Sequence, residues 1–225
     1  MIISFAHRFI FIHGPKTAGT AMAKALASIC GPDDIVALQR RNGFSKHDDS
    51  AKIYHHVGAA TWKKFFKFTF ERNPWDKVVS LYCMQIDPDH WRRTDVSRGT
   101  QISNQLRRLR YRRQPPSFRR WLLGKTKSRF HTKLPEYAGK LYHVEGDLAI
   151  DFVGRFENIE GDFRMITDRL NLQVELGGAT RELRRRDDPQ FDAQKPSYRK
   201  YYTPELREIV AETYTKEIRL FGYRF

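Results

Sequence analysis

A short loop near the start of the chain gathers the residue types that bind an anion. Phe9–Ile12 is an apolar run typical of a buried strand, the loop Gly14–Gly19 follows, and Thr20 begins a segment rich in Ala, Met and Leu. Where a strand passes through a glycine loop into a helix, backbone N–H groups and the helix N-terminus point at one place. Lys16 adds a full positive charge there, and Thr17 and Thr20 add hydroxyl groups. The loop therefore suits a phosphate or a sulfate group.

The order of residues in this loop differs from that of the common nucleotide-binding P-loop. The P-loop pattern G-x-x-x-x-G-K-[ST] places lysine directly after its second glycine. Here Lys16 precedes Gly19, and the loop is shorter. The serine or threonine that would hold Mg²⁺ in a P-loop therefore lacks its usual setting, which counts against an ATP-dependent kinase.

A second group of polar residues follows a second apolar run. Phe68–Phe70 is typical of a buried strand, Arg72 comes after it, and Asn73 and Pro74 suit the N-cap and first turn of a helix. An arginine at the end of a strand can offer two parallel N–H bonds to a phosphate. Ser80 lies about two turns into the expected helix, on a side that can face the same group. These side chains indicate a second contact with an anion.

The two motifs resemble those of the sulfotransferases that use 3′-phosphoadenosine 5′-phosphosulfate (PAPS). Pro15–Thr20, with the sequence PKTAGT, is similar to the 5′-phosphosulfate loop PKTGGT or PKSGTT, with Ala18 at a position where glycine is common. Phe68–Ser80 is similar to the 3′-phosphate segment of that family, in which R-[ND]-P is followed by a serine. Asp151–Ile159 and the chain from Tyr201 onward resemble the carbohydrate-type, sulfotransferase family 2-like branch. The resemblance covers most of the chain in four separate blocks.

The resemblance implies an enzyme that moves a sulfuryl group from PAPS to a hydroxyl of a carbohydrate or glycolipid by in-line displacement. The product nucleotide would be 3′-phosphoadenosine 5′-phosphate (PAP), and no metal is expected to be needed. Lys16 is the expected catalytic cation, because it can stabilise charge on the leaving oxygen. Two alternatives stay open. Arg155 could occupy a purely structural position, and residues 197–199 could form a solvated basic turn. The residues expected to bind the nucleotide are Pro15, Lys16, Thr17, Ala18, Gly19, Thr20, Ala21, Arg72, Ser80, Arg155, Ser197, Tyr198 and Arg199.

The expected catalytic base is a histidine, because imidazole titrates near neutral pH. Tyr54–Gly58 carries the adjacent pair His55 and His56, and its pattern predicts the end of a strand. Neighbouring strand residues point to opposite faces, so we expect only one of the pair to serve. The glycan 2-O-sulfotransferases, which this segment resembles, have one residue between two histidines. The match of Val57 favours His56, the alternative being a packed or surface histidine, and His13 is less favoured because the preceding strand is expected to bury it.

The order of elements predicts an α/β fold. A strand, a loop and a helix occur in turn at 8–30 and again at 67–85, and two such units joined by crossovers predict a parallel sheet with flanking helices. We therefore expect a P-loop-like three-layer sandwich with a central parallel sheet, in which Met1–Ile12 supplies the first strand. Other elements are expected at Ile35–Leu38, Thr61–Phe66, Gln101–Arg113, Ser117–Leu123, Leu141–Val144, Phe152–Phe156, Ile159–Leu170 and Thr203–Tyr214, with a loop at 177–198.

Composition predicts a single domain over residues 1–225, with an Arg-rich variable helical segment at about 91–140. That segment holds 15 Lys and Arg against Asp95 and Glu136, so it carries +13 of the net charge of +15. Such a field implies an anionic partner, and an acidic glycan, an anionic membrane or nucleic acid would each supply one. A solvated helix face is the plain alternative, and nucleic acid is less favoured because the chain has no recognised nucleic-acid motif.

The remaining features favour a cytoplasmic protein and leave a peripheral position at a membrane surface open. The chain has no apolar run long enough to span a bilayer and only two cysteines, Cys30 and Cys83, which do not make a disulfide framework. Two other readings stay open: a P-loop-type nucleotide kinase, and an anion- or RNA-binding protein on the same scaffold without activity. The identity of the acceptor and the oligomeric state do not follow from the sequence.

Overall fold

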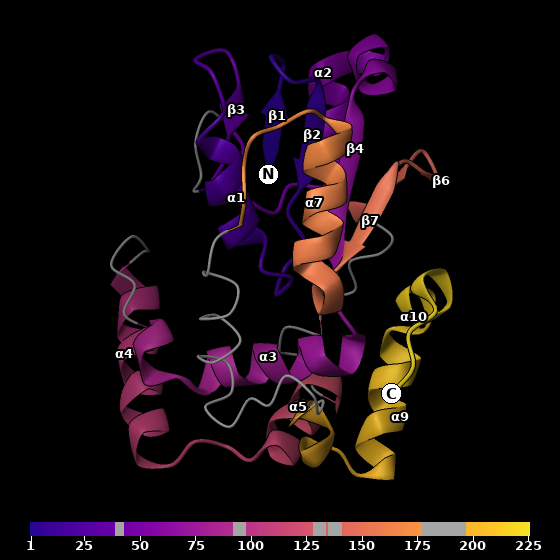
Figure 1. Ribbon diagram of the computed structural model, residues 1–225. Coiled ribbons are helices and arrows are strands. Elements are labelled where there is room, and N and C mark those ends of the chain that lie inside the picture. The colour runs from indigo at the N-terminus through magenta and orange to yellow at the C-terminus, as the bar shows by residue number, and fades with distance from the viewer. Residues whose placement is uncertain (39–42, 92–97, 128–133, 135–140, 177–196) are drawn as a thin grey trace. The chain divides into compact units, whose positions relative to one another are not determined.

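The computed structural model describes residues 1–38, 43–91, 98–127, 134, 141–176 and 197–225 (Figure 1). By its internal contacts the chain divides into two compact units. The first unit comprises Met1–Asn73 with Glu136–Leu183, and the second comprises Pro74–Pro135 with Arg184–Phe225. The single-domain organisation stays a prediction, and each unit is described by itself below.

A five-stranded sheet in the order β3-β1-β2-β4-β7 forms the centre of the first unit. Its strands are β1 (Ile2–Ser4), β2 (Phe9–Ile12), β3 (Ile35–Val36), β4 (Phe66–Glu71) and β7 (Phe152–Arg155). β4 runs parallel to both β2 and β7, whereas β1 runs antiparallel to β2 and β3. The α/β class is thus confirmed with a mostly parallel sheet, and the P-loop-like three-layer sandwich stays a prediction.

The prediction of one strand over Met1–Ile12 is wrong, because the chain turns back between β1 and β2. Asp34, from a later loop, stabilises this turn: its Oδ1 accepts the N–H of Phe5 at 2.6 Å, and its Oδ2 accepts the hydroxyl of Ser4 at 2.9 Å. Arg8 closes the turn with a φ of 54°. The exposed and polar residues between the strands are therefore a hairpin turn and not part of a continuous strand.

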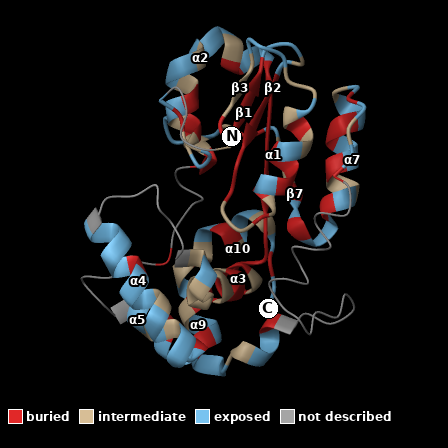
Figure 2. Ribbon diagram, turned by 90° about the vertical axis from the view of Figure 1, so that its left-hand side faces the viewer, coloured by how far each residue is buried: buried red, intermediate tan, exposed pale blue. Residues whose placement is uncertain are grey.

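Two helices cover one face of the sheet. Figure 2 shows the strands nearly edge-on, with α1 (Gly19–Ala27) and α7 (Ile159–Arg169) on the same side. The side chains between them form one apolar cluster that includes Phe9, Phe11, Phe66, Phe68, Phe70, Met22, Leu26, Phe163 and Ile166. Alternate residues of β2 and β4 supply the phenylalanines, as the period of two in a strand requires. α7 confirms the helix predicted at Ile159–Leu170.

The other face carries α2 (Ser50–Lys64) (Figure 2). Asp49 begins this helix by accepting the backbone N–H of Lys52 at 2.9 Å, and Gly58, with φ 77° and ψ 159°, breaks its helical geometry inside. Only glycine adopts that conformation without strain. The helix predicted at Thr61–Phe66 is thus the last part of a longer, kinked element. A short hairpin of β5 (His143–Val144) and β6 (Asp147–Leu148) completes the unit with the 3₁₀ turn η2 (Phe156–Asn158).

The second unit is helical. Among its described residues, the α-helices are α3 (Pro74–Ile86), α4 (Arg98–Arg113), α5 (Phe118–Lys127), α9 (Pro204–Thr213) and α10 (Thr215–Phe221), with the 3₁₀ turns η1 (Pro88–Trp91) and η3 (Ser197–Tyr201). An aromatic cluster holds it together and includes Trp75, Tyr82, Phe118, Trp121, Tyr198 and Tyr214. The Thr203 hydroxyl accepts the N–H of Leu206 at 3.4 Å, which confirms the predicted N-cap. The helices predicted at Gln101–Arg113 and Ser117–Leu123 are confirmed as α4 and α5.

Candidate active site

The loop between β2 and α1 has a backbone that alternates in handedness. Lys16 has a φ of 63° and Ala18 a φ of 60°, whereas Thr17 and Gly19 do not have positive φ. Alternating right- and left-handed residues turn successive N–H groups toward one side and form a nest that binds an anion. The α1 N-terminus follows directly, since Ala18 is its N-cap residue. The backbone of the loop thus has the alternating φ pattern of a nest, and its binding of an anion stays a prediction.

The hydroxyl groups of Thr17 and Thr20 differ in their exposure to solvent. Thr17 is buried, and its Oγ1 donates a hydrogen bond of 2.8 Å to the carbonyl oxygen of Gly14. This bond closes the loop, so Thr17 supports the backbone and its proton is not directed to a ligand. Thr20 is exposed in the first turn of α1, where a hydroxyl can reach an anion, and Ala21 is buried behind it.

Two close contacts explain why glycine occurs at both ends of the loop. A Cβ atom on Gly19 would lie 2.0 Å from Cδ2 of His13, and a Cβ atom on Gly14 would lie 2.9 Å from the carbonyl oxygen of Phe70. Both distances are below van der Waals contact. Gly14 therefore allows the loop to approach β4, and Gly19 allows the imidazole of His13 to pack under the loop.

Arg72 connects the end of β4 with this loop. Its Nη1 donates a hydrogen bond of 3.3 Å to the carbonyl oxygen of Lys16, and its guanidinium carbon lies 4.0 Å from the centre of the Phe156 ring. Only 6% of Arg72 is exposed. The structure thus brings together two of the residues predicted from separate motifs, Lys16 and Arg72. Phe156 gives the arginine a fixed orientation, since a guanidinium stacks favourably on an aromatic face.

Two carboxylates, the buried one of Glu71 and the exposed one of Glu157, fix the backbone on either side of Arg72. Glu71 is 1% exposed, and its Oε1 accepts the backbone N–H of Arg72 at 2.8 Å while its Oε2 accepts the hydroxyl of Tyr142. Glu157 accepts the N–H of Asn73 at 2.7 Å. A buried carboxylate with hydrogen bonds to N–H groups is stabilised in its position. The end of β4 is therefore rigid at the point where Arg72 leaves the sheet.

The imidazole of His13 lies in the interior beneath the loop. It is 3% exposed, and its Nδ1 has no hydrogen-bond partner among the described residues. Burial, together with the neighbouring His47, lowers the pKa of His13 to about 2. His13 is therefore neutral at physiological pH and stays inside the fold, as expected from the strand that precedes it.

His47 is a candidate that the sequence analysis missed. Its Nδ1 lies 3.0 Å from the carbonyl oxygen of His13, and the two ring centres are 4.7 Å apart. A carbonyl oxygen only accepts, so Nδ1 carries the proton, and Nε2 of the neutral ring keeps its lone pair. Partial removal from water lowers the pKa of His47. The contact joins residues that are 34 positions apart, and no local spacing in the sequence indicates it.

His55 and His56 occupy a different environment from the one predicted. The predicted strand at this position is wrong, because the Asp49 N-cap places both residues in α2. Both side chains are exposed. The ring of His56 lies edge-on to the ring of Phe44, with the two ring centres 4.8 Å apart. Since neighbouring helix residues are about 100° apart, the argument from opposite strand faces does not apply. Their role as a base stays a prediction.

The block around β7 supports Arg72 through Phe156. A Cβ atom on Gly154 would lie 2.4 Å from the Phe70 ring, so glycine at this position lets β7 pack against β4. Arg155 is exposed, and its backbone N–H donates to Asp162 at 2.6 Å. Gly154 and Phe156 therefore have packing roles in this block, and both nucleotide binding by Arg155 and its structural alternative stay predictions.

The remaining predicted residues belong to the second unit. Ser80 is 2% exposed on α3, and Tyr198 is 7% exposed within the aromatic cluster. Arg199 is exposed, and its Nη2 donates a hydrogen bond of 2.7 Å to the carbonyl oxygen of Phe225. Ser197 begins η3, so this part of the predicted basic loop is a 3₁₀ turn, and residues 195–196 lie outside the described residues.

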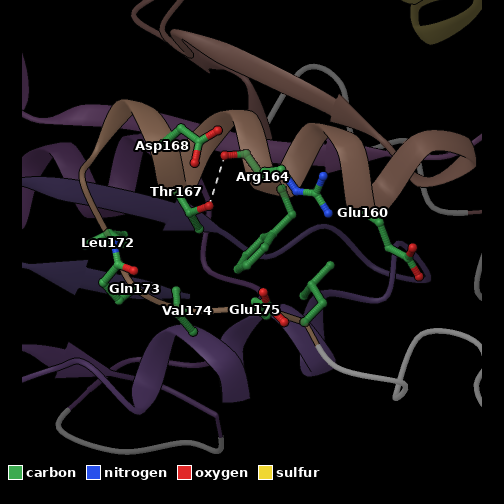
Figure 3. A pocket seen from close by; sticks show the side chains of 10 residues that line it. Glu160, Arg164, Thr167, Asp168, Leu172, Gln173, Val174 and Glu175 are labelled. Atoms are coloured by element: carbon green, nitrogen blue, oxygen red, sulfur yellow. Dashed lines mark hydrogen bonds between the residues drawn. The ribbon is translucent and has the colours of Figure 1, made fainter.

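A separate pocket lies beside α7 in the first unit. Figure 3 shows it between one side of α7 and the segment Leu172–Leu176, with a volume of about 740 Å³. The carboxylates of Glu160, Asp168 and Glu175 line it together with Arg164. No residue of the anion loop lines it, and its acidic lining does not suit an anionic nucleotide.

Comparison with known proteins identifies the family of the whole chain. A family model described as "Sulfotransferase family" matches residues 1–224. The chain belongs to the sulfotransferase family. The sulfotransferase is also similar to an uncharacterized protein of Archaeoglobus fulgidus, with 27% identity over 124 residues, which are 55% of this chain and 82% of that protein. No solved structure matches the chain.

Two further observations describe the sulfotransferase as a whole. Within the residues that the structure describes, no group of three or more His, Cys, Asp or Glu side chains could hold a metal ion. None of the described helices is long and apolar enough to cross a membrane.

Proposed function

We propose that this sulfotransferase moves the sulfuryl group of PAPS to a hydroxyl of a carbohydrate or glycolipid and leaves PAP. The observation that carries the proposal is the loop of residues 14–20. Its backbone has the alternating φ pattern of a nest, and the carbonyl oxygen of Lys16 in this loop accepts a hydrogen bond from Arg72. This geometry fits a sulfate or phosphate group. The carbohydrate class of acceptor rests on the resemblance of the motifs to the carbohydrate-type branch.

The loop and Arg72 would act on opposite ends of the donor. In the proposed reaction the loop N–H groups and Lys16 stabilise the charge that develops on the bridging oxygen of the leaving nucleotide. Arg72 and Ser80 are proposed to hold the 3′-phosphate and so to fix the orientation of the donor. The rigid end of β4 and the Phe156 ring support this role of Arg72, while the role of Ser80 rests on the sequence motif alone. Arg155, Ser197, Tyr198 and Arg199 are proposed as further nucleotide contacts on the same basis.

The acceptor proton is proposed to move to a histidine in step with bond formation. The acceptor oxygen forms a bond to sulfur, the bond from sulfur to the bridging oxygen breaks with its electron pair leaving on PAP, and the proton passes to the lone pair of a neutral imidazole. Sequence resemblance favours His56 for this role. The hydrogen bond of His47 to His13, directly before the loop, favours His47, because it fixes the proton on Nδ1 and leaves Nε2 as the acceptor. We therefore propose His47 as the base.

Binding and transfer assays test the proposed donor. Calorimetry with PAP should show binding without a metal, and incubation with labelled PAPS should transfer label to one or more compounds in a panel of glycans, glycolipids and phenols. Arg72→Lys keeps the charge but removes the bidentate fork, so PAP binding should weaken by about tenfold or more. Absence of PAP binding together with Mg²⁺-dependent ATP binding would instead support the kinase reading.

Paired variants separate the two candidate bases. His47→Ala should lower turnover by about a hundredfold or more while PAP affinity stays unchanged, because general base catalysis contributes at that level. His56→Ala, at an exposed position on α2, serves as the matched variant. In the unmodified protein kcat/KM should fall on the acid side with an apparent pKa below 6.5, the ordinary value, since the pKa of His47 is lowered. Loss of turnover in His56→Ala with normal turnover in His47→Ala would reverse the assignment.

A further inference from the structure

Helix α4 carries an apolar stripe that faces solvent. Ile102, Leu106 and Leu109 are 56%, 64% and 53% exposed. Their spacing of four and then three residues places them on one side of the helix. Single exposed leucines are ordinary at a protein surface, but three in one line form a continuous apolar strip. Figure 2 colours almost all of α4 as exposed.

The opposite side of α4 attaches the helix to the second unit. Asn104 on this side is only 8% exposed. The Nη2 atoms of Arg108 and Arg112 lie 3.8 and 3.9 Å, respectively, from Oδ1 of Asp89 on η1. At about 100° per residue, Asn104 and Arg108 point away from Leu106 and Leu109. The stripe is therefore presented outward by a helix that is docked through its other face.

The stretch of chain that carries the stripe has positive side chains and no acidic ones, and Asp89 on η1 pairs with the arginines of the docked face. Between residues 98 and 127, which include α4 and α5, the chain has ten Lys and Arg residues and no Asp or Glu. Like charges lie close enough to affect one another: partial burial and the charge of Arg107 lower the pKa of Lys125. An anionic partner would relieve this repulsion.

The combination of apolar stripe and positive border selects one kind of partner. A second copy of this chain would place one set of arginines against another, which like-charge repulsion disfavours. Nucleic acid or a soluble acidic glycan would meet the arginines but would leave Ile102, Leu106 and Leu109 in water, because aliphatic side chains give no stacking surface of the kind that aromatic rings provide. The surface of an anionic bilayer meets both, since it offers phosphate headgroups above an apolar interior.

We propose that α4 binds the surface of membranes that contain anionic lipid. The helix would lie parallel to the membrane, with Ile102, Leu106 and Leu109 at the boundary between headgroups and acyl chains. The arginines beside the stripe would contact lipid phosphates. Three apolar side chains and a basic border give reversible, salt-sensitive attachment of a peripheral kind.

Flotation with vesicles tests this docking on the full chain. The protein should float with vesicles of phosphatidylcholine and phosphatidylserine, and should stay unbound with phosphatidylcholine alone. Leu106→Trp places a fluorescent reporter in the stripe at an exposed site, and its emission should shift to shorter wavelength only with the anionic vesicles. Equal binding to both kinds of vesicle would overturn the proposal.

Two sets of variants separate the apolar from the electrostatic contribution. Replacing Ile102, Leu106 and Leu109 by Ser should weaken vesicle binding by about tenfold or more, because the apolar insertion is removed. The matched control changes three other exposed apolar residues, Leu148, Met165 and Leu220, to Ser, and should bind normally. Equal loss in both sets would overturn the role of α4.

The charge set tests the headgroup contacts. Arg107→Gln, Arg110→Gln and Arg113→Gln together should weaken binding by on the order of a hundredfold at low salt. The exposed residues Arg164, Arg219 and Arg224, changed to Gln, are the control and should have a small effect. Unchanged folding of each variant is checked by circular dichroism. Equally tight binding to a soluble polyanion, with no emission shift of the Leu106→Trp reporter on vesicles, would contradict the membrane proposal and indicate a polyanion site.

Discussion

The anion loop of the first unit and helix α4 of the second unit both present positive charge, but they do so in opposite ways. The loop holds one lysine in a backbone with two defined contacts. Gly19 packs on the His13 ring, and Arg72 donates a hydrogen bond to the carbonyl oxygen of Lys16. Helix α4 has six arginines and no acidic residue of its own, and four of the five arginines whose side chains the structure describes are exposed. A fixed single charge can select one position of one group, whereas many exposed charges along a helix attract an extended anionic surface.

This difference predicts different responses to mutation. In a preorganised site one substitution removes most of the function, because the remaining groups cannot move to replace the lost charge. On a surface with many like charges each substitution removes a similar small share, and salt screens the whole interaction. The following experiments test whether the two regions really divide in this way.

The largest effect is expected from Lys16→Ala. Removal of a positioned cation at the leaving oxygen should lower turnover by about 10²–10³-fold. Lys24→Ala, at an exposed position in the same α1 segment, is the matched control and should keep full activity. The rates are measured with labelled PAPS and a soluble acceptor. Under these conditions the three-arginine α4 variant should also stay active, and a comparable loss there would show that the two regions do not act separately.

The next effect is expected from Gly19→Ala, which tests the packing that shapes the loop. A Cβ atom 2.0 Å from the His13 ring forces either the imidazole or the loop to move. Overpacking of this kind should lower the free energy of unfolding by about 1–3 kcal/mol and weaken PAP binding. Gly31→Ala is the control, because nothing lies within 4 Å of the Cβ position there. Chemical denaturation gives the stability change, and equal stability of both variants would contradict the observed packing.

A smaller effect concerns the pH dependence of stability. The pKa of His13 is lowered from 6.5 to about 2 in the folded state, so below pH 6.5 the unfolded chain takes up a proton that the folded chain does not. Stability should therefore fall with decreasing pH, by about 2 kcal/mol between pH 7 and pH 5 from this residue alone. His13→Gln should remove that share of the slope, whereas His55→Gln, at an exposed position, should leave the slope in place. Denaturation curves at several pH values decide between these outcomes.

The same contrast explains how much the sequence could predict. The strand, loop and helix around Lys16 follow each other directly, so local pattern was enough to predict the loop, α1 and the later helix α7. Contacts between distant residues were not accessible in this way. The turn between β1 and β2 depends on Asp34, and the position of His47 depends on the carbonyl of His13. Such pairings arise only when the sheet and its loops come together.

The pair His55 and His56 shows a second kind of failure. The segment Tyr54–Gly58 was expected at the end of a strand, and its Tyr54 and Val57 are residue types common in strands. The observed helix begins at Asp49 and is reinforced by the ion pair of Lys52 with Asp48 at 2.7 Å. Helix signals several residues before the segment outweighed the preference of the segment itself. The N-cap is visible in the sequence and could have corrected the prediction.

The smallest expected effect is a gain in stability, from Ala18→Gly. Ala18 adopts a φ of 60°, and a residue with a Cβ atom is strained in that conformation by about 1 kcal/mol. Glycine, which is common at this position in the resembling loops, should raise the free energy of unfolding by about that amount while PAP affinity stays the same. Ala60→Gly, at an exposed position in α2, should change stability in the opposite direction because glycine is a poor helix former. A loss of stability in Ala18→Gly would mean that the left-handed conformation at this residue does not occur in solution. The nest that is proposed to bind the donor would then need another origin.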